Sequence, residues 1–137
     1  MLKAIAVRLR RGQDLKQEIV RIVSQNDVGA GFVGTCIGSV TSARIRTAVQ
    51  HGDEYTELEG PFDILSLTGT LAPGEADGCH LHISLGDGDG SVFGGHLQPG
   101  TLVATTAEIV LCVLDSISFS RELDNSTGFP ELVVNEL

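Results

Sequence analysis

Three of the four histidines in the 137-residue sequence lie in one stretch, GCHLHISLGDGDGSVFGGHL, at residues 78–97. Alternate residues of a β-strand project to the same face, so His80 and His82 are predicted to share a face. The Asp-Gly pairs that follow favour a tight hairpin turn. Such a turn would return the chain antiparallel and bring His96 beside the other two rings.

Three imidazoles that meet at one point form a donor set that suits Zn²⁺, which binds histidine nitrogen at about 2.0–2.1 Å. Three protein ligands leave a fourth position for water or for a substrate carbonyl or carboxylate. We therefore predict a divalent metal site, with zinc as the metal, at His80, His82 and His96. The pattern leaves one alternative open: three histidines on a wet sheet face or at a subunit interface.

Two other residue types in this stretch are not expected to bind the metal. Strand alternation directs Cys79 to the face opposite His80, which argues against Cys79 as a ligand. Asp87 and Asp89 lack the spacing of a calcium-binding loop, so we interpret them as turn residues.

A metal with an open position needs a nearby acid or base if it is to be catalytic, and the acidic candidates are Glu59, Asp63 and Glu108. Glu108, in TTAEIV, stands out because an acid inside an apolar strand must be paired or functional. Its alternative role is an ion pair with one of the early arginines. The sequence has no nucleophile elbow, P-loop or dinucleotide-binding fingerprint.

The elements that must position these residues are mostly strands. LKAIAVRLR alternates as a half-buried strand, and Asp14 is expected to cap an amphipathic helix that ends near residue 26. Residues 101–123 are expected to form one long strand that bends or breaks near its start, followed by a peripheral tail over about 122–137. The other predicted strands are rich in β-branched residues and glycine and lie at 31–40, 43–49, 60–72, 79–87 and 91–97.

Short turns between consecutive strands favour antiparallel pairing, and the Gly-Pro at residues 60–61 suits the start of a strand. The 17 glycines are typical of bulges and close backbone approaches in a sheet that curls. We predict a single domain over residues 1–137, of the α+β class. It would contain a strongly bent, mostly antiparallel, barrel-like sheet with one main amphipathic helix near residues 14–26.

Charge is distributed unevenly along the chain, whose net charge is −9. Eight of the nine Lys and Arg residues, but only three of the 18 Asp and Glu residues, precede residue 47. The net charge disfavours nucleic acid as a partner, whereas the basic strip can hold a small anionic ligand or an acidic patch on a neighbouring subunit. A solvated charged edge is the alternative. The three cysteines lack CxxC spacing, which indicates a reducing, cytoplasmic setting, and no apolar run reaches the roughly 18–20 residues of a membrane span.

Four segments together resemble one known family: RLRRGQDL, EGPFDILSLTGT, HLHISLGDGDGSVFGGHL and TTAEIVL. In this order they are similar to the PPC (plants-and-prokaryotes-conserved) domain, from about residue 5 to residue 115. In plants this domain follows AT-hook motifs in nuclear DNA-binding proteins. This sequence has no Arg-Gly-Arg-Pro core, so it looks like the stand-alone prokaryotic form. The resemblance implies a homotrimer of α+β subunits, with zinc held by His80, His82 and His96.

The plant proteins use a Gly-Arg-Phe-Glu-Ile-Leu segment to contact partner proteins. The resemblance therefore implies a partner-binding segment at the corresponding positions here, which are Gly60, Pro61, Phe62, Asp63, Ile64 and Leu65. Proline replaces arginine and aspartate replaces glutamate in this chain, and both changes weaken the transfer of that role.

A more distant similarity is to the α-acetolactate decarboxylases, which hold zinc with an HxH pair and a later histidine. Their reaction polarises a small acid at the metal with help from glutamate and arginine, for which Glu108 and Arg8 are counterparts in type. Three functions follow from these observations: a trimeric metal-binding module that recognises a partner protein or small ligand, a metal-dependent lyase or hydrolase of a small carboxylated substrate, and a DNA-associated regulator. The catalytic candidates for the second are Glu108, Asp63 and Arg8, and charge disfavours the third.

Overall fold

The computed structural model describes residues 1–74 and 78–137, and within them it contains one helix and eight strands. None of the described helical residues forms a helix long and apolar enough to cross a membrane. In chain order the elements are β1 (Leu2–Arg10), α1 (Leu15–Gln25), β2 (Gly31–Arg46), β3 (Thr56–Leu71), β4 (Cys79–Gly86), β5 (Val92–Leu97), β6 (Leu102–Leu114), β7 (Ile117–Asp124) and β8 (Phe129–Glu136).

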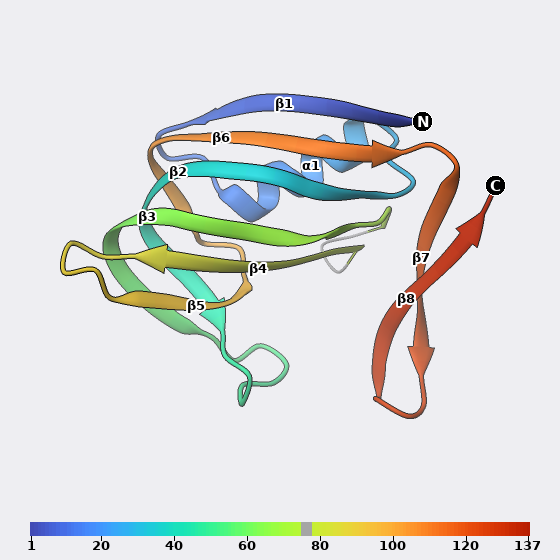
Figure 1. Ribbon diagram of the computed structural model, residues 1–137. Helices are drawn as coiled ribbons and strands as arrows, with labels where there is room; N and C mark the ends of the chain where they lie inside the picture. Colours follow the sequence, from blue (N-terminus) through green and yellow to red (C-terminus); the bar gives the residue numbers. More distant parts are fainter. Residues whose placement is uncertain (75–77) are drawn as a thin grey trace.

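Six strands form one antiparallel sheet in the order β1-β6-β2-β3-β4-β5 (Figure 1). The sheet bends so strongly that the end of β2 also pairs with β5, where Ile45 lies opposite Leu97 and Arg46 opposite His96. This extra pairing partly closes the sheet into a barrel. The predicted α+β class and the strongly bent, mostly antiparallel sheet are confirmed.

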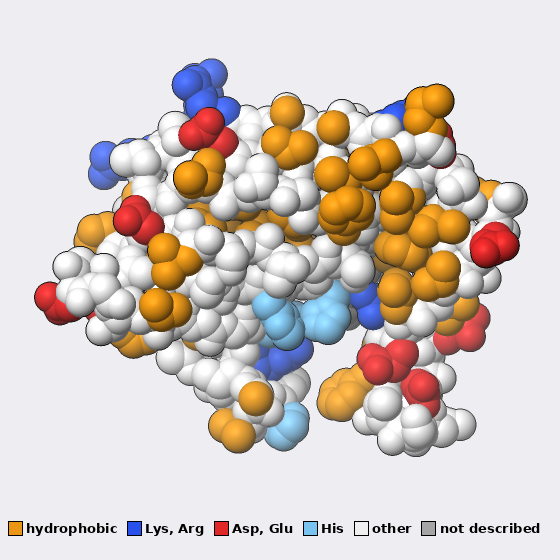
Figure 2. Space-filling model, in the orientation of Figure 1, with side chains coloured by type: hydrophobic (Ala, Val, Ile, Leu, Met, Phe, Trp, Pro, Cys, Tyr) orange, Lys and Arg blue, Asp and Glu red, His pale blue; other side chains and the backbone are white. Residues whose placement is uncertain are grey.

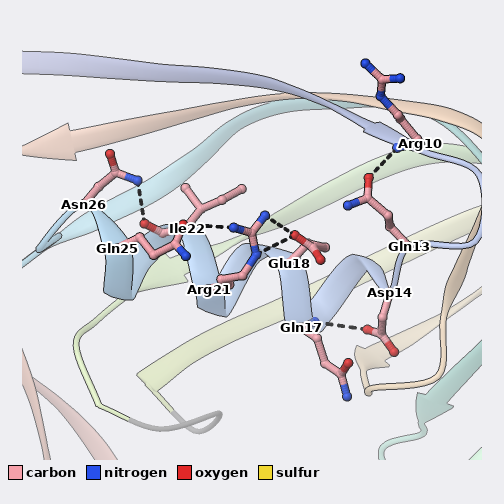
Figure 3. Close-up of polar contacts among 9 residues, drawn as sticks. All are labelled: Arg10, Gln13, Asp14, Gln17, Glu18, Arg21, Ile22, Gln25 and Asn26. Carbon is pink, nitrogen blue, oxygen red and sulfur yellow. Dashed lines mark hydrogen bonds and ion pairs between the residues drawn. The ribbon is translucent and has the colours of Figure 1, made fainter.

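Helix α1 begins where the sequence predicts, because Asp14 caps it. The Asp14 carboxylate accepts a hydrogen bond from the Gln17 backbone N–H at 3.0 Å, and Asn26 closes the other end by donating to the Ile22 carbonyl (Figure 3). The helix lies against one side of the sheet and buries its apolar residues there (Figure 1). Arg21 pairs with Glu18 on its exposed side.

The main core lies between α1 and the sheet and is filled by aliphatic side chains. Strand β4 contributes by strict alternation, since Cys79, Leu81, Ile83 and Leu85 are all buried. The residues between them in the sequence must therefore face the other side of the sheet. That alternation places the β4 histidines outside the core.

The boundaries of β2 and β3 differ from the prediction. The predicted strands at 31–40 and 43–49 are one 16-residue strand, β2, which ends at Arg46 and has a register shift between Val40 and Ser42. Strand β3 begins at Thr56, so Gly60 and Pro61 lie inside it and do not open it. They lie opposite this shift, where a bulge leaves the proline without a ladder partner, and this explains why a proline is tolerated there.

The C-terminal part of the chain forms a separate hairpin, which Figure 1 shows projecting from the end of the main sheet. The predicted long strand over 101–123 breaks in its second half, at residues 115–116, and β7 then pairs with β8 alone. Near its start β6 is continuous, but its register with β2 shifts between Val103 and Ala107. A small cluster of Ala30, Ala72 and Phe119 attaches the hairpin to the main body. The break falls at Asp115 and Ser116, two residue types that favour turns, but the apolar residues on either side make this signal easy to miss.

Candidate metal centre

The three histidines of the predicted site lie on two neighbouring strands. His80 and His82 belong to β4, and His96 on β5 is the cross-strand partner of His82. Their ring centroids are 5.0 Å apart for His80 and His82, 5.2 Å for His80 and His96, and 5.5 Å for His82 and His96. One nitrogen from each ring lies within 4.8 Å of the others.

This arrangement fits one metal ion. Nitrogens bound to a tetrahedral zinc ion are about 3.4 Å apart, so small rotations of the three rings are enough to bring them onto a common ion. No fourth protein ligand joins this group among the described residues. The donor set is therefore of the open kind, with three neutral imidazoles and a position for an external ligand.

The site lies in a hollow that is open to solvent. His80 and His82 are exposed and His96 is half-buried. Figure 2 shows the histidines at the inner end of a hollow between the main body and the β7–β8 hairpin. An ion bound there would be reachable by a small molecule from one side.

The local environment favours the neutral form of two of the rings, His80 and His96. Burial, followed by the neighbouring His82 and Arg121 side chains, lowers the pKa of His80. Burial and the adjacent Arg46 guanidinium lower the pKa of His96 to about 4. A neutral imidazole has the free lone pair that a metal ligand needs, so the environment prepares these nitrogens for coordination at neutral pH.

The residues that were not expected to be ligands lie where the sequence predicts. Cys79 faces the core, and burial raises the pKa of its thiol, which disfavours the thiolate that binds metal. In the β4–β5 turn, the Asp87 carboxylate accepts hydrogen bonds from the backbone N–H groups of Asp89 and Ser91, each at 2.9 Å. Asp87 therefore organises the turn that returns β5 to β4.

Glycines let the strands of the site approach one another closely. A β-carbon on Gly94 would lie 2.7 Å from the Ile83 carbonyl oxygen, and one on Gly95 would lie 2.7 Å from the Arg46 carbonyl oxygen. Gly69 on β3 is the most restricted of these, because a β-carbon there would lie 1.9 Å from the His80 carbonyl oxygen. The backbone position of His80 thus depends on glycine at residue 69.

This dependence predicts the effect of Gly69→Ala. The added methyl group would force β4 away from β3 at His80, so we expect the free energy of unfolding of the metal-free protein to fall by roughly 2–4 kcal/mol. Urea denaturation followed by circular dichroism measures this. Gly88→Ala is the matched control, because a β-carbon on this turn residue meets nothing within 4 Å. Equal stability of the two variants would contradict the prediction.

The acidic candidates lie away from the histidines. Glu108 is exposed on β6, which β2 and β3 separate from β4; three strand spacings amount to about 14 Å. Asp63 pairs with Gly86, four residues along β4 from His82, which corresponds to roughly 13 Å. Glu59 is exposed still further back along β3.

Arg8 lies directly opposite Glu108 across the β1–β6 pair. Both side chains are exposed on the outer face of the sheet. Cross-strand neighbours of opposite charge stabilise a sheet modestly, by about 0.2–1 kcal/mol, so this placement agrees with the pairing alternative for Glu108. The structure brings neither residue to the three rings.

The segment from Gly60 to Leu65 is half buried by strand alternation. Phe62 and Ile64 belong to the core, and the Phe62 ring packs against Phe93 at 5.9 Å between centroids. Pro61, Asp63 and Leu65 are exposed. A hollow of about 330 Å³ lies beside the segment, lined by Leu58, Glu59, Gly60, Pro61, Phe62, Asp87, Gly88, Asp89 and Phe93.

Sequence reasoning singled out a basic strip before residue 47 but did not place any basic residue beside the histidines. Arg46 is the cross-strand partner of His96. The Arg121 guanidinium on β7 donates to the Thr70 hydroxyl at 3.4 Å, and Thr70 is the cross-strand partner of His80. The Lys16 ammonium donates to the Cys79 carbonyl at 2.6 Å. One signal was available, since Arg121 is the only Lys or Arg after residue 46.

Comparison with known proteins gives one family. The profile of the Plants and Prokaryotes Conserved (PCC) domain, the same domain as the PPC domain above, matches residues 1–115. The chain is 47% identical over 131 residues to a bifunctional protein GlmU of Synechococcus sp., covering 96% of this chain and 20% of that protein. It is 30% identical to AT-hook motif nuclear-localized protein 2 of Arabidopsis thaliana, covering 77% of this chain and 32% of that protein. The chain thus spans a fifth to a third of these curated relatives.

Solved structures share the fold over nearly the whole chain. A hypothetical protein from Salmonella enterica is 35% identical, with a TM-score of 0.92 over 99% of this chain and 95% of that one. A structure described as a metal-containing protein from Archaeoglobus fulgidus is 30% identical, with a TM-score of 0.77 over 96% of this chain and 93% of that one. A plant- and prokaryote-conserved protein from Pyrococcus horikoshii is 25% identical, with a TM-score of 0.79 over 100% of this chain and 97% of that one.

Proposed function

The chain belongs to the Plants and Prokaryotes Conserved (PCC) domain family, and from this premise we propose that it is a homotrimeric protein that binds zinc at His80, His82 and His96. The observation that carries the proposal is the convergence of three imidazole nitrogens within 4.8 Å on one hairpin. The similarity to a structure described as metal-containing supports it. A zinc ion at such a site supplies Lewis acidity at its open position.

Zinc is proposed over other divalent ions because of the donor set. Three imidazoles without a carboxylate suit zinc and other late transition metals, whereas magnesium and calcium prefer oxygen ligands. Backbone pairing between β4 and β5 brings the three histidine residues together without needing the metal. We therefore expect a folded protein that takes up metal, in contrast to domains that fold only around their ion.

We propose that the subunits assemble through the outer face of the sheet. Figure 2 shows exposed apolar side chains gathered above the histidines. The large apolar residues exposed on β2 and β3 are Phe32, Ile37 and Leu65. Large exposed apolar patches mark interaction surfaces. A second and third copy of the chain are the occupants that the family resemblance implies. The three cysteines are free thiols, which supports the reducing, cytoplasmic setting proposed for the assembly.

We do not assign DNA binding or a catalysed reaction to this chain. Its net charge of −9 disfavours contact with a phosphate backbone. The acidic candidates for a lyase or hydrolase lie roughly 13–14 Å or more from the rings, and general acid–base catalysis requires direct reach or one bridging water.

Metal content tests the proposal directly. We expect protein purified without chelators and dialysed against metal-free buffer to retain about one zinc ion per chain by elemental analysis. Diffraction data collected on both sides of the zinc absorption edge should give an anomalous peak between the three rings. Protein that stays metal-free after incubation with excess zinc would contradict the proposal.

A further inference from the structure

Positive charge surrounds the three histidines on several sides, although the chain as a whole is acidic. Arg46 lies beside His96 through β2–β5 pairing, and Arg121 reaches Thr70, the cross-strand neighbour of His80. Lys16 adds a buried ammonium at the Cys79 carbonyl. Figure 2 shows Lys and Arg side chains on either side of the histidines.

The position of Arg121 is the most informative of these. Residues 47–137 contain 15 of the 18 acidic residues and Arg121 as their only Lys or Arg. The β7–β8 hairpin carries this one base to the histidine site. Within the part of the chain that the structure describes, its buried Nε has no hydrogen-bond partner, which is unusual for a guanidinium N–H.

The charges around the rings are not balanced. Glu131 on β8 is the carboxylate whose charge acts on His80, against the positive charges of Arg121 and Lys16. The positive charges of Arg46 and Lys16 both act on His96. A divalent ion on three neutral imidazoles would add two more positive charges to this environment. Such a centre is stabilised when its open position holds an anion.

We propose that the external ligand of this site is a small oxyanion, bound through one oxygen to the metal and through its remaining oxygens to Arg121 and Arg46. The proposal rests on the metal site proposed above. Guanidinium groups suit this role because their planar N–H donors match the oxygens of carboxylates and phosphates. Carboxylates and phosphates would both fit such a site, and the experiment tests each of them separately.

The test uses the full chain loaded with Co²⁺, whose visible spectrum reports the ligand at the open position. Acetate and inorganic phosphate are titrated separately into the loaded protein, with chloride at equal ionic strength as the blank. We expect at least one of the two to shift the spectrum saturably. We also expect Arg121→Gln and Arg46→Gln each to weaken that binding by roughly 10-fold or more, the scale of a hydrogen bond to a charged group.

Matched variants separate this proposal from the metal site and from folding. Arg11→Gln removes the same charge from an exposed turn and should change the anion affinity less than about 2-fold. Arg121→Lys keeps the charge and should retain part of the affinity, and circular dichroism checks the fold of each variant.

Each outcome of the titration has a stated meaning. Full Co²⁺ uptake with a spectrum that neither anion changes would overturn the oxyanion proposal alone. Failure of the unmodified chain to bind Co²⁺ would overturn both proposals. Wild-type anion affinity in both folded arginine-to-glutamine variants would also refute the proposed role of these arginines.

Discussion

The His82→Ala variant is expected to lose most of its bound zinc. His82 is one of the three rings of the site, 5.0 Å from that of His80 and 5.5 Å from that of His96. Its removal leaves two imidazoles on an exposed surface. Loss of groups that merely orient a ligand costs about 10–100-fold in metal affinity, so loss of a ligand itself should cost at least ~100-fold.

Elemental analysis after dialysis measures this loss, and the fourth histidine supplies its control. His51 lies in the exposed loop between β2 and β3 and is not part of the three-histidine group. The His51→Ala variant should therefore keep the zinc content of the unmodified protein. If His82→Ala kept the same content, the ion would have to bind elsewhere and the proposed site would be wrong.

The Ile37→Asp variant is expected to dissociate the assembly into single chains. Ile37 is 61% exposed on the outer face of the sheet, and its cross-strand neighbour there is Glu108. In a subunit interface the new carboxylate would be buried beside another acid. An uncompensated buried charge costs about 3–5 kcal/mol, and a symmetric assembly repeats this cost in every copy.

Sedimentation equilibrium should give three times the 14.4 kDa chain mass for the unmodified protein and a single chain mass for this variant. Val49→Asp introduces the same carboxylate at a more exposed aliphatic residue, in the loop after β2, and should leave the assembly intact. Zinc content should be equal in both variants, because one chain supplies all three histidines. A trimer of Ile37→Asp would exclude this face as the interface.

Local patterns in the sequence are enough to predict the β4–β5 hairpin with its three histidines, and helix α1. Two-residue alternation in β4 separates His80 and His82 from the core residues, and the Asp-Gly turn returns His96 to the same face. Asp14 and the apolar residues that follow it at helical spacing likewise define α1 within one residue at each end. These features depend on residues that are close together along the chain.

The features that sequence reasoning missed depend on distant pairing. Arg46 reaches His96 only because the bent sheet brings the end of β2 to β5, and Arg121 reaches the site only because β7 leaves the main sheet. The bulge that accommodates Pro61 is a property of two strands together. The periodicity of one segment does not show how that segment pairs with a distant one. The acids chosen for their local context therefore proved to be distant from the rings.

The β7–β8 hairpin has a consequence for how relatives of this protein can diverge. It lies beyond the residues that the family profile matches, is held by a small cluster of its own, and carries Arg121. Under the proposals above, the three metal ligands and one of the two anion-binding arginines would thus be encoded in different parts of the chain. If both proposals hold, natural variation confined to residues 117–136 would alter the contribution of Arg121 to anion binding while the three histidines stay the same.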